Sequence, residues 1–537
     1  MSSVAEHPDV IVVGAGAGGP VVAKELAERG VRVLVLEAGP WLDPDRDYTR
    51  LEHDMNALVE GKFRWGPPDR DKGPWVRRRE NVGLIWQTAG VGGSTLHYNG
   101  ISTRAFRANV DDTWPLTYDN LVPYYERVED FLPVLLVSDL ATKDALFATG
   151  CEKIGLTRSE SRDVTQDVWR PCHNAILPIA SMSNGVALRY PEVDGCTMCG
   201  HCIIGCPNPQ GAPLERKAKR ATNVSYVPAA LATGHCEIVT GAFATRVLFE
   251  SSSGAKPARA RGVRWRDGSS GEEREAEAAV VVLAGGSIEN PRLWLNSGLP
   301  NSHDAVGRRL TTHYQDLVTG FFDHDVHPYR GQVTMARADF PGQGTFFSQG
   351  LGPQAFAVAM STGVGFWDQP TGATWDTQGR CWGPELSRRM AQYARSLSVI
   401  LSVNDESDPN NRVMLADDWP ADEHGPVPKV VYHPTQKTVE RQAFLAEKAA
   451  EVLKAAGAHT VHKTNIGVLL THIMGTMRMG RDPRATVVDA DGEAHEVERL
   501  YVGDSSILPS VGGANPTLTA QALAARTGDR IASRYFS

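Results

Sequence analysis

The chain of 537 residues has no run of about 18 uninterrupted apolar residues, the length that a membrane-spanning helix needs. It also has no long basic stretch, and its formal net charge of −8 is diluted over the whole length. We therefore expect neither a transmembrane segment nor a nucleic-acid partner. Too few residues precede the first predicted strand for a secretory signal, so we expect the protein in the cytoplasm unless a partner subunit carries an export signal.

The length exceeds what one hydrophobic core usually organises, so we expect at least two domains. The densest basic cluster, Arg77 to Arg79, is interpreted as a solvated loop, with a basic patch facing an anionic ligand as the alternative. Residues 41–81 are rich in Pro, Asp, Arg and Gly and show little periodicity. We interpret them as a lid or interface segment that crosses over a bound ligand.

The first informative segment is a strand followed by a glycine-rich turn. Four β-branched residues, Val10 to Val13, predict a buried strand, and a second strand is predicted over 31–36. The glycines between them have the spacing of a dinucleotide-binding turn: Gly14, Gly16 and Gly19. The first allows the tight turn, the second lets the backbone approach a pyrophosphate, and the third lets helix and strand pack closely. Glu37, after the second strand, is placed to accept hydrogen bonds from a ribose diol.

A second glycine-rich loop contains the pair Gly92 and Gly93, too many glycines for a helix or strand interior, and indicates a backbone that wraps a ligand closely. With the polar run that ends at Asn99, it resembles the flavin-contacting loop of the glucose–methanol–choline (GMC) oxidoreductase family. The resemblance implies FAD as the cofactor. His97 stands where family members with a covalently attached flavin carry the linking histidine, and both a covalent and a non-covalent flavin fit its presence.

Other segments extend the resemblance from Asp9 to Tyr535. The sequence predicts a helix from Thr222 and a strand over 275–283. The part of that strand from Ala279, which runs into a helix ending before Gly298, resembles a second signature of the family. Asp504 resembles the flavin-binding acid at the end of the last strand, and Pro516 and Thr517 are assigned to the cofactor site. The resemblance implies an α/β fold, with a Rossmann-type FAD-binding domain and a substrate domain built on an antiparallel sheet backed by helices.

The resemblance also implies discontinuous domains. The FAD-binding domain is assigned to 8–40, 82–110, 218–320 and 463–537, and the substrate domain to 111–217 and 321–462. Within the latter, alternating apolar residues over 397–403 predict a half-buried strand, and 435–456 predict an amphipathic helix with Val439 and Leu445 on its apolar face. His313 is interpreted as structural or pocket-lining and is left out of the chemistry.

Two polar residues near the C-terminus are candidates for catalysis. His472 lies in an apolar segment before a glycine turn, and Asn515 lies at a predicted loop-to-helix boundary. Family members pair a catalytic His with a His or Asn at nearly this separation, so the resemblance implies that both side chains reach the flavin N5. Alcohol oxidation needs a base for the hydroxyl proton, and neutral imidazole, with an ordinary pKa near ~6.5, suits that role. Asn515 cannot take the proton but can hold the substrate oxygen through its amide N–H groups.

Four of the eight cysteines lie close together: Cys196, Cys199, Cys202 and Cys206. Their spacing, C-x2-C-x2-C-x3-C-P, is that of bacterial ferredoxins and predicts an iron–sulfur cluster, either 4Fe–4S or 3Fe–4S. The alternatives are disulfides, structural thiols or zinc; a cytoplasmic chain argues against disulfides, and zinc usually takes two cysteine pairs set farther apart. His201, inside the run, is interpreted as a neighbour that tunes the potential rather than as a ligand.

Together these features predict an FAD-dependent dehydrogenase whose substrate is a sugar, polyol, steroid or aryl alcohol. The flavin takes up two electrons at once, and an iron–sulfur cluster beside it would pass them on one at a time. The cluster therefore indicates that an external one-electron acceptor or a small partner subunit receives the electrons. One alternative is an oxidase that returns the electrons to oxygen and uses the cysteine loop structurally. A second alternative is an electron-transfer subunit without a substrate of its own.

Overall fold

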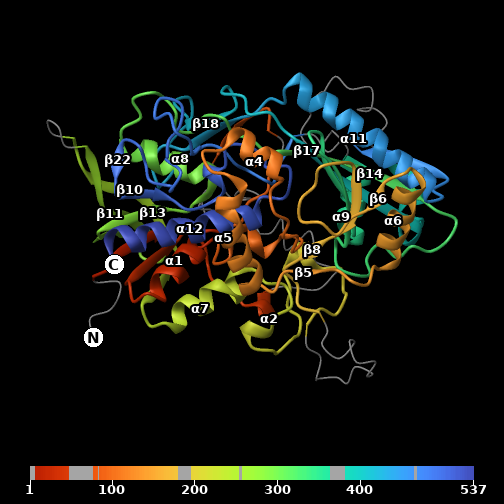
Figure 1. Cartoon of the computed structure of the whole chain (residues 1–537), viewed down its shortest axis with the longest axis horizontal. Coiled ribbons are helices and arrows are strands. Elements are labelled where there is room, and N and C mark those ends of the chain that lie inside the picture. Colours follow the sequence, from red (N-terminus) through yellow and green to blue (C-terminus); the bar gives the residue numbers. More distant parts are fainter. Residues whose placement is uncertain are drawn as a thin grey trace.

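The computed structural model describes residues 7–47, 77–82, 84–178, 195–252, 257–362, 381–464 and 468–536. Two large sheets organise an elongated molecule (Figure 1). A five-stranded parallel sheet lies in the half that contains α12 (Thr517–Tyr535), and a seven-stranded sheet lies in the half that contains α11 (Gln436–Ala455). No helix within these ranges is both long and apolar enough to cross a membrane.

The parallel sheet carries the glycine-rich turn. In spatial order its strands are β23 (Leu500–Val502), β13 (Val280–Leu283), β1 (Val10–Val13), β2 (Val33–Glu37) and β9 (Cys236–Thr240). All four strand pairs are parallel. β1 and β13 are buried along their whole length, as expected when helices cover both faces of a parallel sheet. α1 (Gly19–Ala27) follows the turn and packs against α12.

Two sequence-based boundaries in this half are wrong. The strand predicted over 275–283 is two strands, because β12 (Glu273–Glu277) pairs with β11 (Ala258–Asp267) whereas β13 joins the parallel sheet. The helix predicted from Thr222 is interrupted at Ser225, whose hydroxyl donates to the carbonyl of Ala221 at 2.8 Å. The helix α7 (Tyr226–Ala232) starts only after that turn.

The second sheet forms the other half of the molecule. Its strands, in spatial order, are β20 (Thr460–Thr464), β14 (His313–Phe321), β17 (Ser396–Asn404), β16 (Gly344–Gln349), β15 (Ala336–Phe340), β7 (Val168–Pro171) and β6 (Thr157–Arg158). All pairs are antiparallel except β6 with β7. α6 (Thr142–Lys153) and α11 pack against each other and against the sheet, so this is the antiparallel sheet backed by helices that the sequence predicts. β14 belongs to it, although the predicted FAD-binding domain extends to residue 320.

Burial in the second half differs from two predictions. β17 is not half-buried, because Ser398 and Ser402 are as buried as the apolar residues between them. The hydroxyl of Ser398 forms a hydrogen bond with that of Thr319 at 2.9 Å, which satisfies both groups inside the sheet. Val439 is exposed, with 39% of its surface accessible, so the apolar face of α11 begins later, near Leu445.

The basic cluster after residue 76 is not a solvated loop. Residues Arg78–Glu80 form β3, which pairs with β19 (Pro428–Val431). The side chain of Arg77 is only 3% exposed and forms an ion pair of 2.8 Å with Glu289. Most of the predicted lid, residues 48–76, lies outside the described residues, and its described start contains the short helix α2 (Pro44–Asp47).

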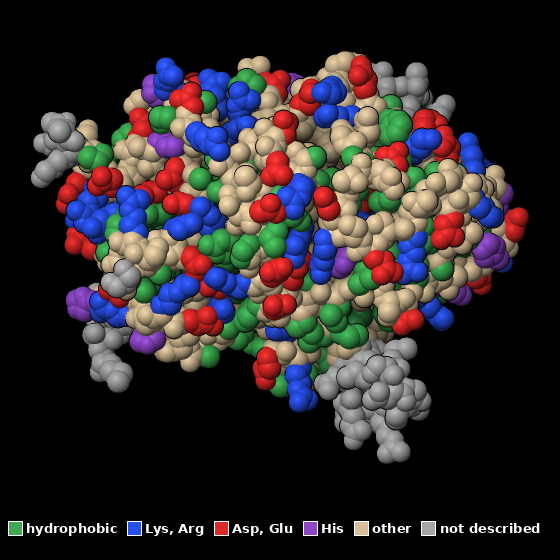
Figure 2. Space-filling model, viewed as in Figure 1, with side chains coloured by type: hydrophobic (Ala, Val, Ile, Leu, Met, Phe, Trp, Pro, Cys, Tyr) green, Lys and Arg blue, Asp and Glu red, His purple; other side chains and the backbone are tan. Residues whose placement is uncertain are grey.

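Further elements complete the two halves: α4 (Arg107–Thr113), α5 (Tyr118–Phe131), α8 (Gly286–Ser297), α9 (Pro353–Thr362), α10 (Gly383–Ala391), β10 (Ala242–Glu250) and β18 (Arg412–Leu415). On the face shown in Figure 2, basic and acidic side chains are interspersed. That face therefore presents a mixed electrostatic surface rather than a field of one sign.

Candidate functional site

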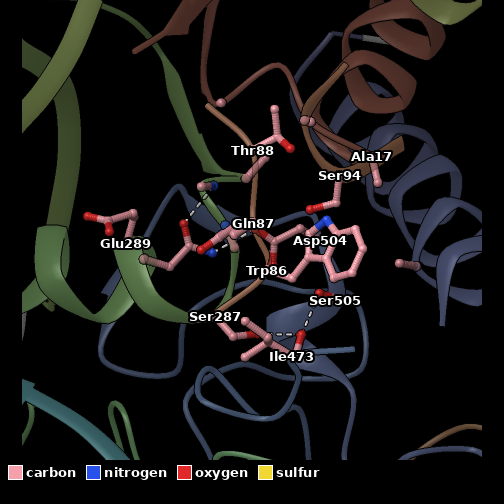
Figure 3. Close-up of a pocket in the computed structure, with 18 of the residues that line it drawn as sticks. Ala17, Trp86, Gln87, Thr88, Ser94, Ser287, Glu289, Ile473, Asp504 and Ser505 are labelled. Carbon is pink, nitrogen blue, oxygen red and sulfur yellow. Dashed lines mark hydrogen bonds between the residues drawn. The ribbon is translucent and has the colours of Figure 1, made fainter. Parts of the chain in front are cut away.

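A single cavity extends from the turn after β1 to the C-terminal loops, and both halves of the molecule line it. The parallel half contributes Gly14, Gly16, Glu37, Gly93, His97, Asn99, Asp504, Asn515, Pro516 and Thr517, and the seven-stranded sheet contributes Gln315, Phe347, Gln349 and Ile400. Figure 3 shows Trp86 and Thr88 around this space together with Asp504 and Ile473. Gly19 and Gly92 are not among the lining residues.

The three glycines of the first turn have different surroundings. Gly14 has a φ of +106°, and a Cβ on it would lie 2.4 Å from the carbonyl oxygen of Ala284. A Cβ on Gly19 would lie 2.0 Å from the oxygen of Gly14, so helix and strand leave no room for a side chain. A Cβ on Gly16 would project into the cavity, where its nearest neighbour is the Cα of Gly93 at 4.0 Å. These positions suit a turn, a packing contact and a close approach to a ligand, respectively.

Glu37 lines the cavity at the end of β2 with a carboxylate that is largely satisfied. It accepts hydrogen bonds from the backbone N–H groups of Ala15 at 2.8 Å, Gly39 at 2.8 Å and Gly90 at 3.0 Å. Burial nevertheless raises its pKa above the ordinary value. A carboxylate offers about four lone-pair sites, so Glu37 can accept one further bond, on the oxygen that Ala15 contacts. A ribose hydroxyl of a dinucleotide is a suitable donor for it.

Asp504 connects the last strand of the parallel sheet to α8. One carboxylate oxygen accepts from the N–H of Gly286 at 2.7 Å and from the amide of Asn290 at 2.9 Å, and the other accepts from Ser506. Burial raises its pKa above the ordinary range. Asp504 therefore fixes the start of α8 at the cavity wall, beside Ser505 and Ser287 (Figure 3).

The second glycine loop presents His97 and Asn99 to the cavity. The Nδ1 atom of His97 accepts from the indole N–H of Trp86 at 2.6 Å and is 3.0 Å from the hydroxyl of Thr88. Burial, with a smaller contribution from the charge of Lys219, lowers the pKa of His97 to about 3. The amide of Asn99 donates to Gln349 at 3.3 Å and so joins this loop to the seven-stranded sheet. Gly92 shapes the loop from outside the cavity.

The structure brings His472 and Asn515 together at the other end of the cavity. The amide Nδ2 of Asn515 lies 3.5 Å from Nε2 of His472. The loop of His472 is held by its neighbour, because the carbonyl of Ile473 accepts from the hydroxyls of Ser287 and Ser505, each at 2.9 Å (Figure 3). Burial lowers the pKa of His472 to about 4, which keeps its imidazole neutral and able to accept a proton.

Two further residues contact this pair: His313, which we interpret from the sequence as structural or pocket-lining, and Arg337, which no sequence pattern singles out. His313 is fully buried, its Nδ1 lies 3.1 Å from Nδ1 of His472, and the two rings stand at 89° to each other. The only sequence signal was a histidine at the start of a strand. Arg337, on β15, donates to Oδ1 of Asn515 at 3.4 Å and to the hydroxyl of Thr103 at 3.0 Å. A single arginine inside a predicted strand gives no sequence signal of that contact.

The four clustered cysteines share one loop beside the cavity. Cys196 and Cys202 are buried with Val333 and Ala218, and Ile203 reaches the cavity lining. Burial, followed by repulsion from the thiolate of Cys206, raises the pKa of Cys202 to about 11. Within the described residues, no group of three or more His, Cys, Asp or Glu side chains has the arrangement of a metal site. The predicted cluster therefore stays a prediction.

One buried lysine joins the cysteine loop to the second glycine loop, which carries His97 and Asn99. The ammonium of Lys219 donates to the carbonyls of Leu96 at 2.6 Å, Tyr98 at 3.2 Å and Cys202 at 2.5 Å. These three acceptors match the three N–H donors of a lysine side chain. The backbone on both sides of His97 is thereby attached to the loop of the four cysteines.

Comparison with known proteins identifies the family. The N-terminal model of the GMC oxidoreductases matches residues 9–315, and the C-terminal model matches residues 407–524. The chain belongs to the GMC oxidoreductase family. Its membership supports FAD as the cofactor that the cavity receives, because the glycine turn, Glu37 and the second glycine loop all face that cavity.

Relatives of this GMC oxidoreductase include both oxidases and dehydrogenases. The chain is 28% identical to 6'''-hydroxyparomomycin C oxidase of Streptomyces lividus, over 98% of this chain and 91% of the relative. It is 26% identical to 2-methyl-1,2-propanediol dehydrogenase of Mycolicibacterium austroafricanum, over 100% of this chain and 97% of the relative. The crystal structure of pyridoxine 4-oxidase from Mesorbium loti has the same fold, with a TM-score of 0.65 and 18% sequence identity. The match covers 98% of this chain and 100% of that one.

Proposed function

We propose that this GMC oxidoreductase is an FAD-dependent dehydrogenase that oxidises the hydroxyl-bearing carbon of an alcohol or sugar. The observation that carries the proposal is the continuity of the cavity. It joins the glycine turn, which suits a dinucleotide, to the pair of His472 and Asn515. A cofactor held at the first end would bring a flavin towards the second, where a neutral base and an amide donor meet.

The chemistry assigned to the protein is proton removal and alignment. When bound, FAD would supply the acceptor for the hydride of the carbinol carbon, which carries both electrons of the oxidation. Nε2 of His472 takes the hydroxyl proton of the substrate, which suits its burial and its lowered pKa. Asn515 has two amide hydrogens, so it can contact both His472 and the substrate oxygen, where negative charge develops.

The walls around this pair suit a hydroxylated substrate. Three amide side chains, Asn99, Gln315 and Gln349, line the cavity together with Phe347 and Ile400. Amides both donate and accept hydrogen bonds, which matches the hydroxyl groups of a polyol or sugar. The apolar residues provide one surface against which a carbon skeleton can pack. The proposal therefore places polyols and sugars ahead of steroids as substrates.

We further propose that electrons leave the flavin through an iron–sulfur cluster held by Cys196, Cys199, Cys202 and Cys206, for an external one-electron acceptor or a small partner subunit. Two observations support the location. Ile203, next to Cys202, lines the same cavity as His472 and Asn515. Lys219 attaches Cys202 to the loop of His97. Burial, and to a smaller extent the neighbouring thiols, raise the pKa values of Cys196 and Cys202, so a metal ion would have to displace their protons on binding.

An oxygen-using oxidase is the second candidate. It is favoured by the relative from Streptomyces lividus, which is an oxidase. In that case the cysteine loop only supports the cavity wall. Iron content separates the two: the dehydrogenase requires about three or four iron atoms per flavin, whereas zinc or no metal supports the oxidase.

The central experiment is anaerobic reduction of the flavin-loaded protein by a panel of sugars, polyols, steroids and aryl alcohols. A substrate bleaches the flavin absorbance in a single turnover. His472→Ala is expected to keep its flavin and to slow that bleaching by roughly 10²-fold or more, the usual contribution of a general base. Near-normal bleaching in His472→Ala would remove it from the mechanism, and a panel without any bleaching would favour an electron-transfer subunit.

The state of the flavin is tested separately. Acid denaturation is expected to release FAD into the supernatant. Colour that stays with the pellet and disappears in His97→Ala would instead establish a covalent bond. Release of FMN would contradict the dinucleotide site.

A further inference from the structure

Four side chains from both halves of the molecule form one row of hydrogen bonds. Arg337 on β15 contacts Asn515, Asn515 contacts His472, and His472 contacts His313 on β14. The atoms in contact are separated by 3.4, 3.5 and 3.1 Å, respectively. The catalytic pair is thus held at both ends by the seven-stranded sheet. The chemistry of the first residue determines which way every bond in the row points.

Arg337 fixes the orientation of the Asn515 amide. A guanidinium has only N–H donors, so the Asn515 atom facing it must be the carbonyl oxygen Oδ1. The NH2 group of the same amide then faces Nε2 of His472. Because an amide NH2 only donates, Nε2 must carry a lone pair and no hydrogen. Arg337 itself is anchored by Asp339, which also pairs with Arg170.

The remaining hydrogen of the neutral His472 ring therefore lies on Nδ1 and points to His313. Nδ1 of His313 must accept it, which leaves the hydrogen of His313 on Nε2. No hydrogen bond to Nε2 of His313 is found among the described residues, and the nearest acceptor by strand register is Asn404. His313 and Asn404 are directly opposite in the register of β14 and β17, and their side chains share one face of the sheet. Nε2 of His313 and Oδ1 of Asn404 are both buried without a hydrogen-bond partner among the described residues.

We propose that Arg337 and His313 are positioning residues that hold His472 in the tautomer with hydrogen on Nδ1 and a lone pair on Nε2. This inference rests on the proposed role of His472 as the base. It deepens that role, since only this tautomer can receive the substrate proton at the atom beside Asn515. After the proton arrives at Nε2, the Nδ1–H bond to His313 persists and still holds the ring. The Asn515 NH2 can then no longer donate to Nε2, which leaves both of its hydrogens for the substrate oxygen.

The direct test is the tautomer itself, read on the flavin-loaded protein without any substrate. Long-range 1H–15N NMR on protein with 15N-labelled histidine rings distinguishes the two tautomers, and the His472 signals are those absent from His472→Ala. We expect hydrogen on Nδ1 of His472 and on Nε2 of His313. Hydrogen on Nε2 of His472 would overturn the proposal, whatever the activity of the enzyme. The wild-type protein suffices, so a variant that fails to fold does not affect this test.

Matched variants of His313 test the consequence for the reaction. His313→Asn places an amide oxygen where Nδ1 accepts, whereas His313→Leu removes the acceptor and keeps an apolar side chain. With the best substrate of the panel, we expect His313→Leu to slow flavin reduction by roughly 10-fold or more, as loss of such positioning contacts does, and His313→Asn to restore most of it. Equal rates in His313→Leu and wild type would contradict the proposal.

His472→Ala in the same assay separates this inference from the proposed function. If His472→Ala reduces its flavin normally, the assignment of the base fails, and the tautomer result then describes only a structural contact. If His472→Ala is slow but His313→Leu is normal, the base stands and the positioning role fails. A slow His313→Leu with a normal flavin spectrum and a rescued His313→Asn supports both.

Discussion

The glycine turn and the cysteine loop are both ligand-type segments beside one cavity, yet they are built in different ways. The turn is shaped by backbone atoms. The carbonyl oxygen of Ala284 fills the space that a side chain on Gly14 would need, and the carbonyl oxygen of Gly14 fills the space that a side chain on Gly19 would need. The cysteine loop is made of side chains: buried thiols whose pKa values are raised and whose arrangement does not close around a metal ion. The first site is complete without its ligand, whereas the second would be completed only by the proposed cluster.

This difference teaches where substitutions should be harmful. Backbone packing is specified by chain geometry, so it persists in the structure without a cofactor. Thiols that bind a metal are oriented by that metal. Their positions in a structure without the metal therefore say little about their positions in the metal-bound loop. We therefore expect changes at the packed glycines of the turn to act on folding and flavin binding together, and changes in the cysteine loop to act on electron transfer alone.

The largest expected effect comes from the turn. Gly19→Ala places a Cβ 2.0 Å from a backbone oxygen, so we expect a loss of about 3 kcal/mol or more in unfolding free energy and little flavin-loaded protein. Gly16→Ala is the matched control, because its Cβ enters the cavity. It should unfold in urea near the cofactor-free wild type but bind FAD poorly, as judged by flavin absorbance. Normal FAD binding by Gly16→Ala would contradict the assignment of the turn.

A smaller and selective effect is expected in the cysteine loop. Cys202→Ser should leave anaerobic flavin reduction near the wild-type rate but lower turnover with a bulky one-electron acceptor by roughly 10-fold or more, because the cluster would be incomplete. Cys151→Ser, which also changes a buried cysteine but lies in α6, controls for burying a hydroxyl. If both rates fall in Cys202→Ser and flavin is lost, the loop is a structural support, and the oxidase is favoured.

The smallest effect concerns acid stability near the second glycine loop. His97 has a folded pKa of about 3, lowered from 6.5 by burial, so between these values the unfolded chain binds more protons. Stability from this group is present at neutral pH and is lost as the pH falls below about 6.5. Relative to His97→Asn, which retains an acceptor for Trp86, the wild type should lose about 2 kcal/mol between pH 7 and pH 5 in urea unfolding. A constant difference across that range would show that His97 is not buried as a neutral ring.

Much of the fold was accessible from local patterns. Continuous β-branched runs such as Val10 to Val13 mark strands that are buried on both faces, and the glycine spacing marks the turn between β1 and α1. Local sequence patterns failed where the structure depends on which strands pair with one another. Nothing local to residues 275–283 shows that β12 and β13 join different sheets. The serines of β17 look exposed in sequence but are covered because one sheet face meets the cavity.

The candidate site shows the same limit. His472 and Asn515 could be proposed because they resemble a family pair, and the structure brings them to 3.5 Å. His313 could be interpreted only as structural or pocket-lining, and Arg337 could not be singled out, because both residues lie on strands of the other sheet, and sequence patterns do not show which side chains those strands bring to the pair. Arg77 was misinterpreted for the same reason: its partner, Glu289, is far away in sequence. Charge composition alone does not reveal that a cation is paired.

The attachment made by Lys219 also bears on how such enzymes diverge. Its ammonium recognises main-chain oxygens of Leu96, Tyr98 and Cys202, which every amino acid possesses. Side chains of the cysteine loop can therefore drift during evolution without releasing the loop from the flavin side. A relative that retains this lysine would keep the cysteine loop attached to the loop of His97, whichever side chains the cysteine loop carries.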